Sequence, residues 1–196
     1  MEIFKKLKSF ISRNGIIFGC FRGTIRISLK ALNYLNTLRW KFILGSLGTG
    51  SVIELGVKIE NPKQVYVGNY SILRKGSLLI SELGTGCLKI GDHVQINEGV
   101  KIDHTGGLNI DNLVLVSEEA IIYSHSHGLD PRSKPVGMRK SIEENVWIGA
   151  RAIILESCQH IGSNSIVGAG SVVTKAVSEN VLVSGMKASV VKTVKR

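Results

Sequence analysis

Aliphatic residues recur at every sixth position through most of this chain after about residue 51. Each is commonly followed by glycine, aspartate or asparagine, as in Ile90-Gly91, Ile96-Asn97 and Ile102-Asp103. A six-residue period does not fit a helix of 3.6 residues per turn and is too long for simple strand alternation. It fits short strands joined by tight corners, because glycine, asparagine and aspartate tolerate the positive φ that a corner needs. The period is carried by Val67, Leu73 and Leu79, by Ile90, Ile96 and Ile102, by Ile110, Val116 and Ile122, by Ile142, Ile148 and Ile154, and by Ile161, Val167 and Val173.

One such unit cannot bury its own apolar side, so successive turns must stack and share a continuous core. The period therefore predicts a mainly β solenoid over residues 51–192, with 193–196 as a short basic tail. The length of 196 residues fits one domain with a small appendage. The two ends of a solenoid expose strand edges, and the segment before it is the natural candidate for one cap.

The period breaks at several places. Ile102 and Ile110 stand two residues further apart than one unit, and Ile148 and Ile161 are 13 residues apart where two units give 12. The first break predicts a short loop, and the second predicts a bulge in one turn. The largest break lies between Ile122 and Ile142 and predicts a loop excursion over residues 123–141. That loop holds two of the five histidines and two of the three prolines.

The first 45 residues are basic, with nine Lys or Arg against Glu2 alone, which gives +8 of the total net charge of +10. Apolar residues recur there at three- and four-residue spacing, so residues 1–50 are predicted to form one or two short amphipathic helices. Two interpretations stay open: a helix attracted to anionic lipid, or a helical cap with a solvated basic face. Nucleic-acid binding is disfavoured because no base-stacking platform accompanies the charge. No uncharged apolar run reaches the roughly 18 residues of a membrane span.

The cysteines indicate the compartment. Cys20, Cys87 and Cys158 are odd in number, and their wide spacing fits neither a disulfide framework nor a zinc knuckle. We therefore expect a cytoplasmic protein, with peripheral attachment to the inner face of the membrane if the basic segment binds lipid.

Two motifs carry a resemblance to a known family. The segments Asn145-Val-Trp-Ile-Gly-Ala150 and Ile166-Val-Gly-Ala-Gly-Ser-Val-Val-Thr-Lys175 are similar to those of the hexapeptide-repeat acyltransferases. Within that family the likeness is greatest to enzymes that acetylate sugars, including the maltose and galactoside acetyltransferases and the O-acetyltransferases of O-antigen and capsule. The resemblance implies a left-handed parallel β-helix, acetyl-coenzyme A as co-substrate, and a homotrimer with active sites between subunits.

The loop excursion holds the candidate catalytic residues. A histidine on a polar loop is usually only solvated, but His127-Gly-Leu-Asp130 resembles the family's His-Pro-Leu-Asp pattern, which contains the catalytic histidine. His127 is therefore predicted to be the general base that takes the proton of a sugar hydroxyl, since a neutral imidazole suits that task near neutral pH. His125 is predicted to orient the substrate or the loop.

The resemblance also implies where the substrates bind. Donor contacts are expected from the backbone of Ala150 and Ala169 and from Thr174, Lys175 and Lys192, while Asn97 and Asp103 are expected near the acceptor, with His104 lining its pocket. Small residues let backbone amides approach a ligand, and lysine neutralises phosphate. The Ala150 amide is the candidate donor to the tetrahedral oxyanion.

The sequence thus predicts an O-acetyltransferase that transfers acetyl from acetyl-coenzyme A to a sugar of a cell-envelope polysaccharide or of its precursor. A non-catalytic solenoid module is the alternative from another class. A zinc hydratase of the carbonic anhydrase type is a lesser one, because the two histidines separated by four residues that it uses are absent here, so no metal is expected. The sugar, the choice between hydroxyl and amine, and the length of the acyl group stay open.

Overall fold

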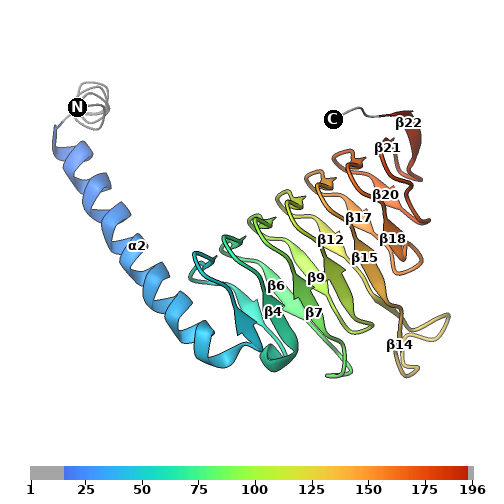
Figure 1. Ribbon diagram of the computed structural model, residues 1–196, viewed down its shortest axis with the longest axis horizontal. Helices are drawn as coiled ribbons and strands as arrows, with labels where there is room; N and C mark the ends of the chain where they lie inside the picture. Colours follow the sequence, from blue (N-terminus) through green and yellow to red (C-terminus); the bar gives the residue numbers. More distant parts are fainter. Residues whose placement is uncertain (1–15, 194–196) are drawn as a thin grey trace.

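The computed structural model describes residues 16–193, and it begins with one long helix. Helix α2 spans Ile16–Ile43, 28 residues in all (Figure 1). The prediction of short helices was wrong in length, because no proline interrupts this segment and glycine is tolerated within a helix. The first predicted amphipathic face, within residues 1–15, and residues 194–196 of the tail lie outside the described residues. No helix in the described part combines the length and apolarity needed to cross a membrane.

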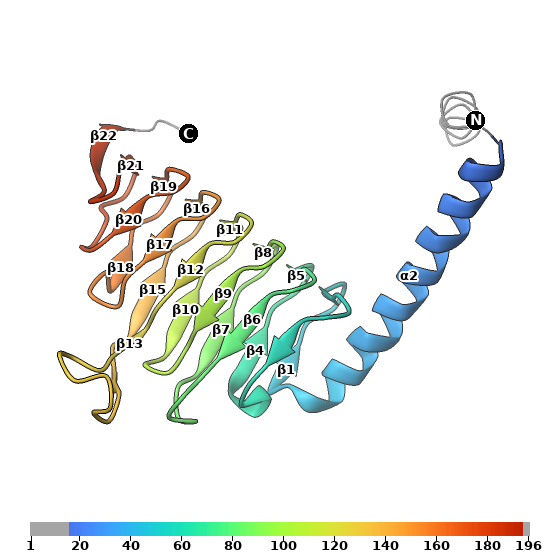
Figure 2. The same ribbon diagram turned by 180° about the vertical axis from the view of Figure 1, so that it is seen from behind.

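The rest of the chain is a solenoid with three parallel sheets as its faces, so the predicted parallel β-helix is confirmed (Figures 1 and 2). Successive turns add one strand to each face, and every neighbouring pair between turns is parallel. Sheet A contains β1 (Ser46–Leu47), β4 (Val65–Val67), β7 (Leu88–Ile90), β10 (Leu108–Ile110), β15 (Lys140–Ile142) and β18 (His160–Ile161). Sheet C contains β3 (Lys58–Ile59), β6 (Leu78–Ile80), β9 (Lys101–Asp103), β12 (Ile121–Ile122), β17 (Ile153–Ile154) and β20 (Val172–Val173).

Sheet B is the longest face and closes the far end. It contains β2 (Val52–Ile53), β5 (Ile72–Leu73), β8 (Gln95–Ile96), β11 (Leu115–Val116), β16 (Trp147–Ile148), β19 (Ile166–Val167), β21 (Val181–Ser184) and β22 (Ser189–Thr193). The last two strands pair antiparallel. This hairpin ends the solenoid, as β22 folds back along β21.

The residues that carry the six-residue period form the core. Leu73, Leu79, Ile96 and Ile102 are completely buried, and the equivalent residues of the other turns join them in one cluster. Burial of a side chain of this size stabilises the fold by about 1.5–3 kcal/mol. Because each turn is too thin to cover its own aliphatic residues, the core exists only through stacking.

Every break in the period falls on the same edge of the solenoid. Corners from sheet A to sheet B and from sheet B to sheet C keep the six-residue spacing, whereas longer segments join sheet C to sheet A. We call the side of the solenoid where sheet B turns into sheet C the B–C edge, and the side where sheet C turns into sheet A the C–A edge. The C–A segments include residues 81–87, 104–107, 124–139 and 155–159, and the largest of them protrude at the lower side of Figure 1. The extra residue predicted between Ile148 and Ile161 lies here, between β17 and β18.

Helix α2 caps the first turn with its C-terminal part. Asn36 donates from Nδ2 to the carbonyl oxygens of Ile53 and Glu54, at 2.9 and 3.1 Å. The hydroxyl of Thr37 accepts the Ile53 amide at 3.0 Å, and Trp40 packs into the core. The remainder of the helix extends away from the sheets in both views (Figures 1 and 2).

Candidate functional site

The two loop histidines lie together on a short hairpin at the C–A edge. Strand β13 (His125–Ser126) pairs antiparallel with β14 (Val136–Gly137) outside the three sheets of the solenoid. The ring centroids of His125 and His127 are 5.2 Å apart, with the edge of one ring toward the face of the other. Both side chains are half-buried, at 12% and 29% exposure. The structure thus brings both predicted catalytic residues to one place.

Asp103 holds His125 in position. Its carboxylate is fully buried, and Oδ2 accepts hydrogen bonds from Nδ1 of His125 at 2.8 Å and from the Ser124 amide at 2.6 Å. Burial opposes ionisation, yet hydrogen bonds from Thr105, Ser124 and His125 together lower the pKa of the Asp103 carboxyl. Because an ionised carboxylate only accepts, the proton of the neutral His125 ring must sit on Nδ1.

His127 is oriented by the hairpin itself. Its Nδ1 lies 2.7 Å from the carbonyl oxygen of Ser133, which can only accept, so this nitrogen carries the proton. The Ser133 hydroxyl in turn donates to the His127 carbonyl and ties the two sides of the loop together. Nε2 of His127 therefore carries the lone pair of the neutral ring. This is the state that a general base requires.

Glu82 joins this pair, and sequence reasoning missed it. Its Oε2 lies 3.2 Å from Nε2 of His127 and 3.6 Å from Nε2 of His125. The residue sits on the 81–87 segment of the C–A edge. A sequence signal existed, because Leu79 and Ile90 are further apart than one unit. We call Glu82, His125 and His127 the EHH cluster.

The residues that the resemblance implies near the acceptor do not lie in one place. The Asp103 carboxylate accepts its hydrogen bonds from neighbouring residues of the same chain and positions His125. Its contact with an acceptor stays a prediction. His104 is fully buried, with Nδ1 donating to the Gly86 carbonyl at 2.9 Å, and therefore lines no open pocket in this chain. Asn97 lies on the B–C edge, where it accepts from Nε of Arg74 at 3.2 Å. The structure therefore does not bring Asn97 to the EHH cluster.

Two of the expected donor residues line a groove on the B–C edge. Ala150 and Ala169 are stacked corner residues, bridged by the Gly170 amide donating to the Ala150 carbonyl at 2.8 Å. The groove has a volume of about 480 Å³ and is also bordered by Glu118, Glu119 and Arg151. Among the described residues no acceptor is recorded for the Ala150 or Ala169 amides. Both remain available to a ligand, as the resemblance implies.

The other donor residues lie elsewhere. Thr174 follows β20 on the C–A edge, where its carbonyl accepts from the Ser157 hydroxyl, and Lys175 beside it is exposed. Lys192 belongs to β22, and its side chain lies outside the described part. Sheet C therefore separates the His127 edge from the edge of Ala150 and Ala169 within one chain.

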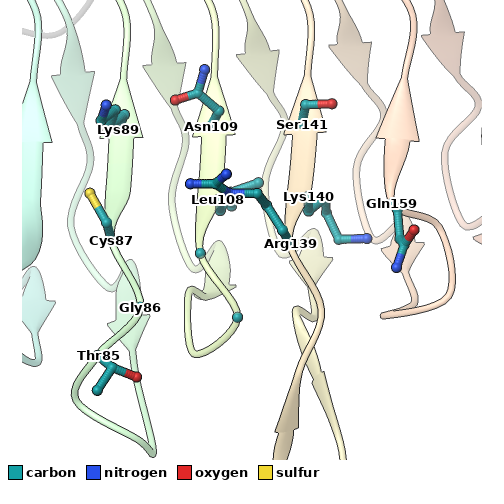
Figure 3. A pocket seen from close by; sticks show the side chains of 12 residues that line it. Thr85, Gly86, Cys87, Lys89, Leu108, Asn109, Arg139, Lys140, Ser141 and Gln159 are labelled. Atoms are coloured by element: carbon teal, nitrogen blue, oxygen red, sulfur yellow. The ribbon is translucent and has the colours of Figure 1, made fainter.

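A basic pocket adjoins the loops on the outer face of sheet A (Figure 3). Its volume is about 690 Å³. Lys89, Asn109 and Ser141 pair in register across β7, β10 and β15, and Figure 3 shows their side chains in one row. Arg139 and Thr85 lie at its loop end, and none of the described residues that line it is acidic. The pocket and Glu82 share the 81–87 segment, although none of the three EHH residues is among those that line the pocket.

Comparison with known proteins supports the likeness to hexapeptide-repeat transferases. Residues 140–175 match the family model described as the hexapeptide repeat of succinyl-transferase. The match covers the strands from β15 to β20, which include the corners of Ala150 and Ala169. The match to this repeat therefore covers 36 of the 196 residues.

Several relatives are named as sugar acetyltransferases. The chain is 30% identical over 128 residues to a protein of Escherichia coli named as the O-acetyl transferase WbbJ of lipopolysaccharide biosynthesis, covering 59% of this chain and 65% of that protein. It is 29% identical over 125 residues to a galactoside O-acetyltransferase of Lactococcus lactis, covering 55% and 60%. The chain thus spans somewhat less than two thirds of the length of these relatives.

Solved structures share the fold. An N-acyltransferase of Bacillus cereus, AntD, superposes with a TM-score of 0.72 at 20% identity over 80% of this chain and 87% of its own; it was solved as a variant with dTDP-4-amino-4,6-dideoxyglucose and coenzyme A. A hexapeptide-repeat acetyltransferase of Vibrio cholerae, solved with acetyl-coenzyme A, gives a TM-score of 0.56 at 23% identity over 98% and 89%. At these identities the likeness concerns the fold.

Proposed function

We propose that this hexapeptide-repeat chain is an O-acetyltransferase that moves the acetyl group of acetyl-coenzyme A to a hydroxyl of a sugar. The observation that carries the proposal is His127, whose Nδ1 proton is held by the Ser133 carbonyl so that Nε2 presents a lone pair. The sugar O-acetyltransferases among the relatives and the shared fold support it.

In this mechanism Nε2 of His127 takes the proton of the sugar hydroxyl as its oxygen attacks the thioester carbonyl. The attack forms a tetrahedral oxyanion, which then collapses. The carbon–sulfur bond breaks, and the coenzyme A thiolate leaves and recovers the proton from His127. Glu82, 3.2 Å from Nε2, stabilises the imidazolium that exists between the two proton transfers.

The donor would lie along the B–C edge. The free amides of Ala150 and Ala169 suit the amide and thioester portion of acetyl-coenzyme A, and an amide at Ala150 would stabilise the oxyanion. Exposed Lys175 lies on the C–A edge, so it would offset the charge of the donor's phosphates from a neighbouring chain. Since His127 stands on the other side of sheet C, we infer that a neighbouring chain supplies one half of each site, in a homotrimer like that implied by the family.

The acceptor would reach His127 from the sheet A pocket. Lys89 and Arg139 favour an anionic acceptor, such as a sugar carried on a diphosphate, over a neutral free sugar. A nucleotide sugar and a lipid-linked sugar both present that group. The bound nucleotide sugar of AntD supports this class.

The helix favours an acceptor at a membrane surface. Its described part carries Arg26, Lys30, Arg39 and Lys41 beside exposed apolar side chains that include Ile27 and Phe42. Such a face lies at anionic headgroups without crossing the bilayer. We therefore infer a cytoplasmic protein that associates peripherally with the inner face of the membrane, where precursors of a cell-envelope polysaccharide would be acetylated.

The test is release of coenzyme A from acetyl-coenzyme A in the presence of neutral sugars, nucleotide sugars, amino sugars and glycolipid extract. The wild-type chain should respond to an anionic sugar hydroxyl acceptor. His127→Ala should lower the rate by about 10²–10⁴-fold, the usual loss on removing a general base. His125→Ala should retain more activity, because that ring only flanks the base.

The control is His93→Ala, which removes a histidine stacked on Tyr70 away from the loop. Equal rates in all four proteins would contradict the assignment of the base. Acetylation of amino sugars alone would make the enzyme an N-acetyltransferase. Failure of acetyl-coenzyme A to bind at all would favour the non-catalytic solenoid module.

A further inference from the structure

The EHH cluster directs three electron-pair donors at one point. Each imidazole donates a hydrogen bond from Nδ1: His125 donates to the Asp103 carboxylate, and His127 donates to the Ser133 carbonyl. A neutral ring has one N–H, so both Nε2 atoms face the Glu82 carboxylate as lone pairs. Acceptors this close are held together by a cation among them, which is either a proton on one imidazole, as in the imidazolium of the proposed mechanism, or a metal ion.

The distances within the cluster suit a metal ion. The two Nε2–Oε2 separations are 3.2 and 3.6 Å, and one ligand atom from each residue lies within 4.8 Å of the others. In a tetrahedral zinc site with bonds of about 2.0–2.1 Å, neighbouring ligand atoms lie about 3.3 Å apart. The two measured separations are close to that value.

The surroundings also resemble those of a metal site. Ligating histidines usually donate their second nitrogen to a carboxylate or a backbone carbonyl, which fixes the ring and raises its basicity. Asp103 and the Ser133 carbonyl play these two parts here. Two histidines and one glutamate form a ligand set that zinc uses when its fourth position is left for water.

We propose that Glu82, His125 and His127 bind one divalent transition-metal ion, best fitted by zinc, and that the bound ion blocks acetyl transfer. The second half rests on the proposed function, because a coordinated Nε2 of His127 has no lone pair left for the acceptor's proton. The sequence led us to expect no metal, because two histidines separated by four residues are absent; Glu82, the third ligand proposed here, comes from a distant segment. The cluster gives the enzyme a metal-controlled inactive state.

Zinc binding is tested by calorimetric titration of the metal-free chain. Wild type should bind one zinc ion per chain, and Glu82→Gln should bind at least tenfold more weakly, because an amide oxygen replaces a charged ligand. The matched control is His160→Gln. His160 also faces a glutamate, Glu143, at 3.7 Å, but no second histidine accompanies it in the clusters found among the described residues.

A second readout does not depend on heat of binding. Zinc should raise the unfolding temperature of wild type and of His160→Gln, and raise that of Glu82→Gln much less, since a ligand stabilises only the state that binds it. The unfolding transition also shows that each variant is folded. No saturable binding in wild type, or equal affinity in Glu82→Gln, would overturn the site.

The effect on acetyl transfer is measured separately, with a chelator and then with zinc. The rate should fall in proportion to zinc occupancy, and half-inhibition should need at least tenfold more zinc in Glu82→Gln. Undiminished transfer with zinc bound would overturn the inactive state. Zinc binding in a chain that acetylates nothing would establish the metal site and refute the proposed function.

Discussion

Lys140 is a charged residue in the position of a core leucine. In the register of sheet A it stacks on Leu108, which stacks on Leu88. Its side chain is 1% exposed, and Nζ donates to the Leu155 carbonyl at 2.9 Å. That carbonyl belongs to the corner with the extra residue between β17 and β18. The same carbonyl accepts the Cys158 amide at 3.0 Å, so the lysine is its second donor.

This burial makes stability depend on pH at Lys140. Desolvation lowers the pKa of the ammonium from 10.5 to about 8. Below pH 8 the folded and unfolded chains both hold the proton, and burial of the charge costs the folded state. Between pH 8 and 10.5 the unfolded chain binds more protons, so stability rises with pH there.

We therefore expect Lys140→Met to gain stability relative to wild type at pH 7, and to lose about 2–3 kcal/mol of that advantage by pH 10. Urea unfolding of both proteins at the two pH values measures the difference, in which groups common to both cancel. Burial raises the pKa of the neighbouring Cys158 thiol in both proteins. A difference independent of pH would contradict a neutral buried lysine.

Helix α2 substitutes for a missing strand at the open end of sheet B. Asn33, Asn36 and Thr37 share one helix face and bond to the free edge of β2 and its corner. A bare edge would invite pairing with other chains. The cap is therefore a matter of hydrogen bonds as much as of the apolar packing of Trp40.

Asn36→Ala should lower the free energy of unfolding by about 1–3 kcal/mol, because it removes the shorter hydrogen bond of the Ile53 and Glu54 carbonyl groups and leaves each with one donor at 3.3 Å, the Thr37 hydroxyl and the Val57 amide. Tyr34→Ala, on the exposed side of the same helix, is the control and should change stability little. Chemical unfolding of the three proteins measures both. An equal loss in the two variants would mean that helix propensity, and not the cap, determines the effect.

The elements divide into those that sequence determines locally and those that it does not. The tight corners follow from the six-residue period, because each unit repeats one conformation. The C–A segments do not repeat, and their meeting depends on turns far apart in sequence. Glu82 reaches His127 in this way. The break in the period between Leu79 and Ile90 can be seen in the sequence, but the direction in which that segment points cannot. Asn97 lies on the B–C edge, so its predicted contact with the acceptor would have to be made across the contact between two chains.

At the scale of the molecule, the proposed active site is divided between two edges. The EHH cluster stands on the C–A edge and the Ala150–Ala169 groove on the B–C edge, with the width of sheet C between them. A rigid solenoid cannot bring its own edges together, because its core is closely packed. Two chains side by side can, when the C–A edge of one faces the B–C edge of the next.

This arrangement predicts complementation between two inactive variants. His127→Ala lacks the base, and Ala169→Trp fills the donor groove, so each variant alone should be inactive. Sedimentation equilibrium should show that each still forms a trimer. In trimers assembled from an equal mixture, a site works when an Ala169→Trp chain supplies His127 and a His127→Ala chain supplies the groove. Random mixing gives roughly a quarter of wild-type activity. Mixed trimers without activity would mean that each chain holds its site alone, and the donor would then have to reach His127 along Thr174 and Lys175 on the C–A edge.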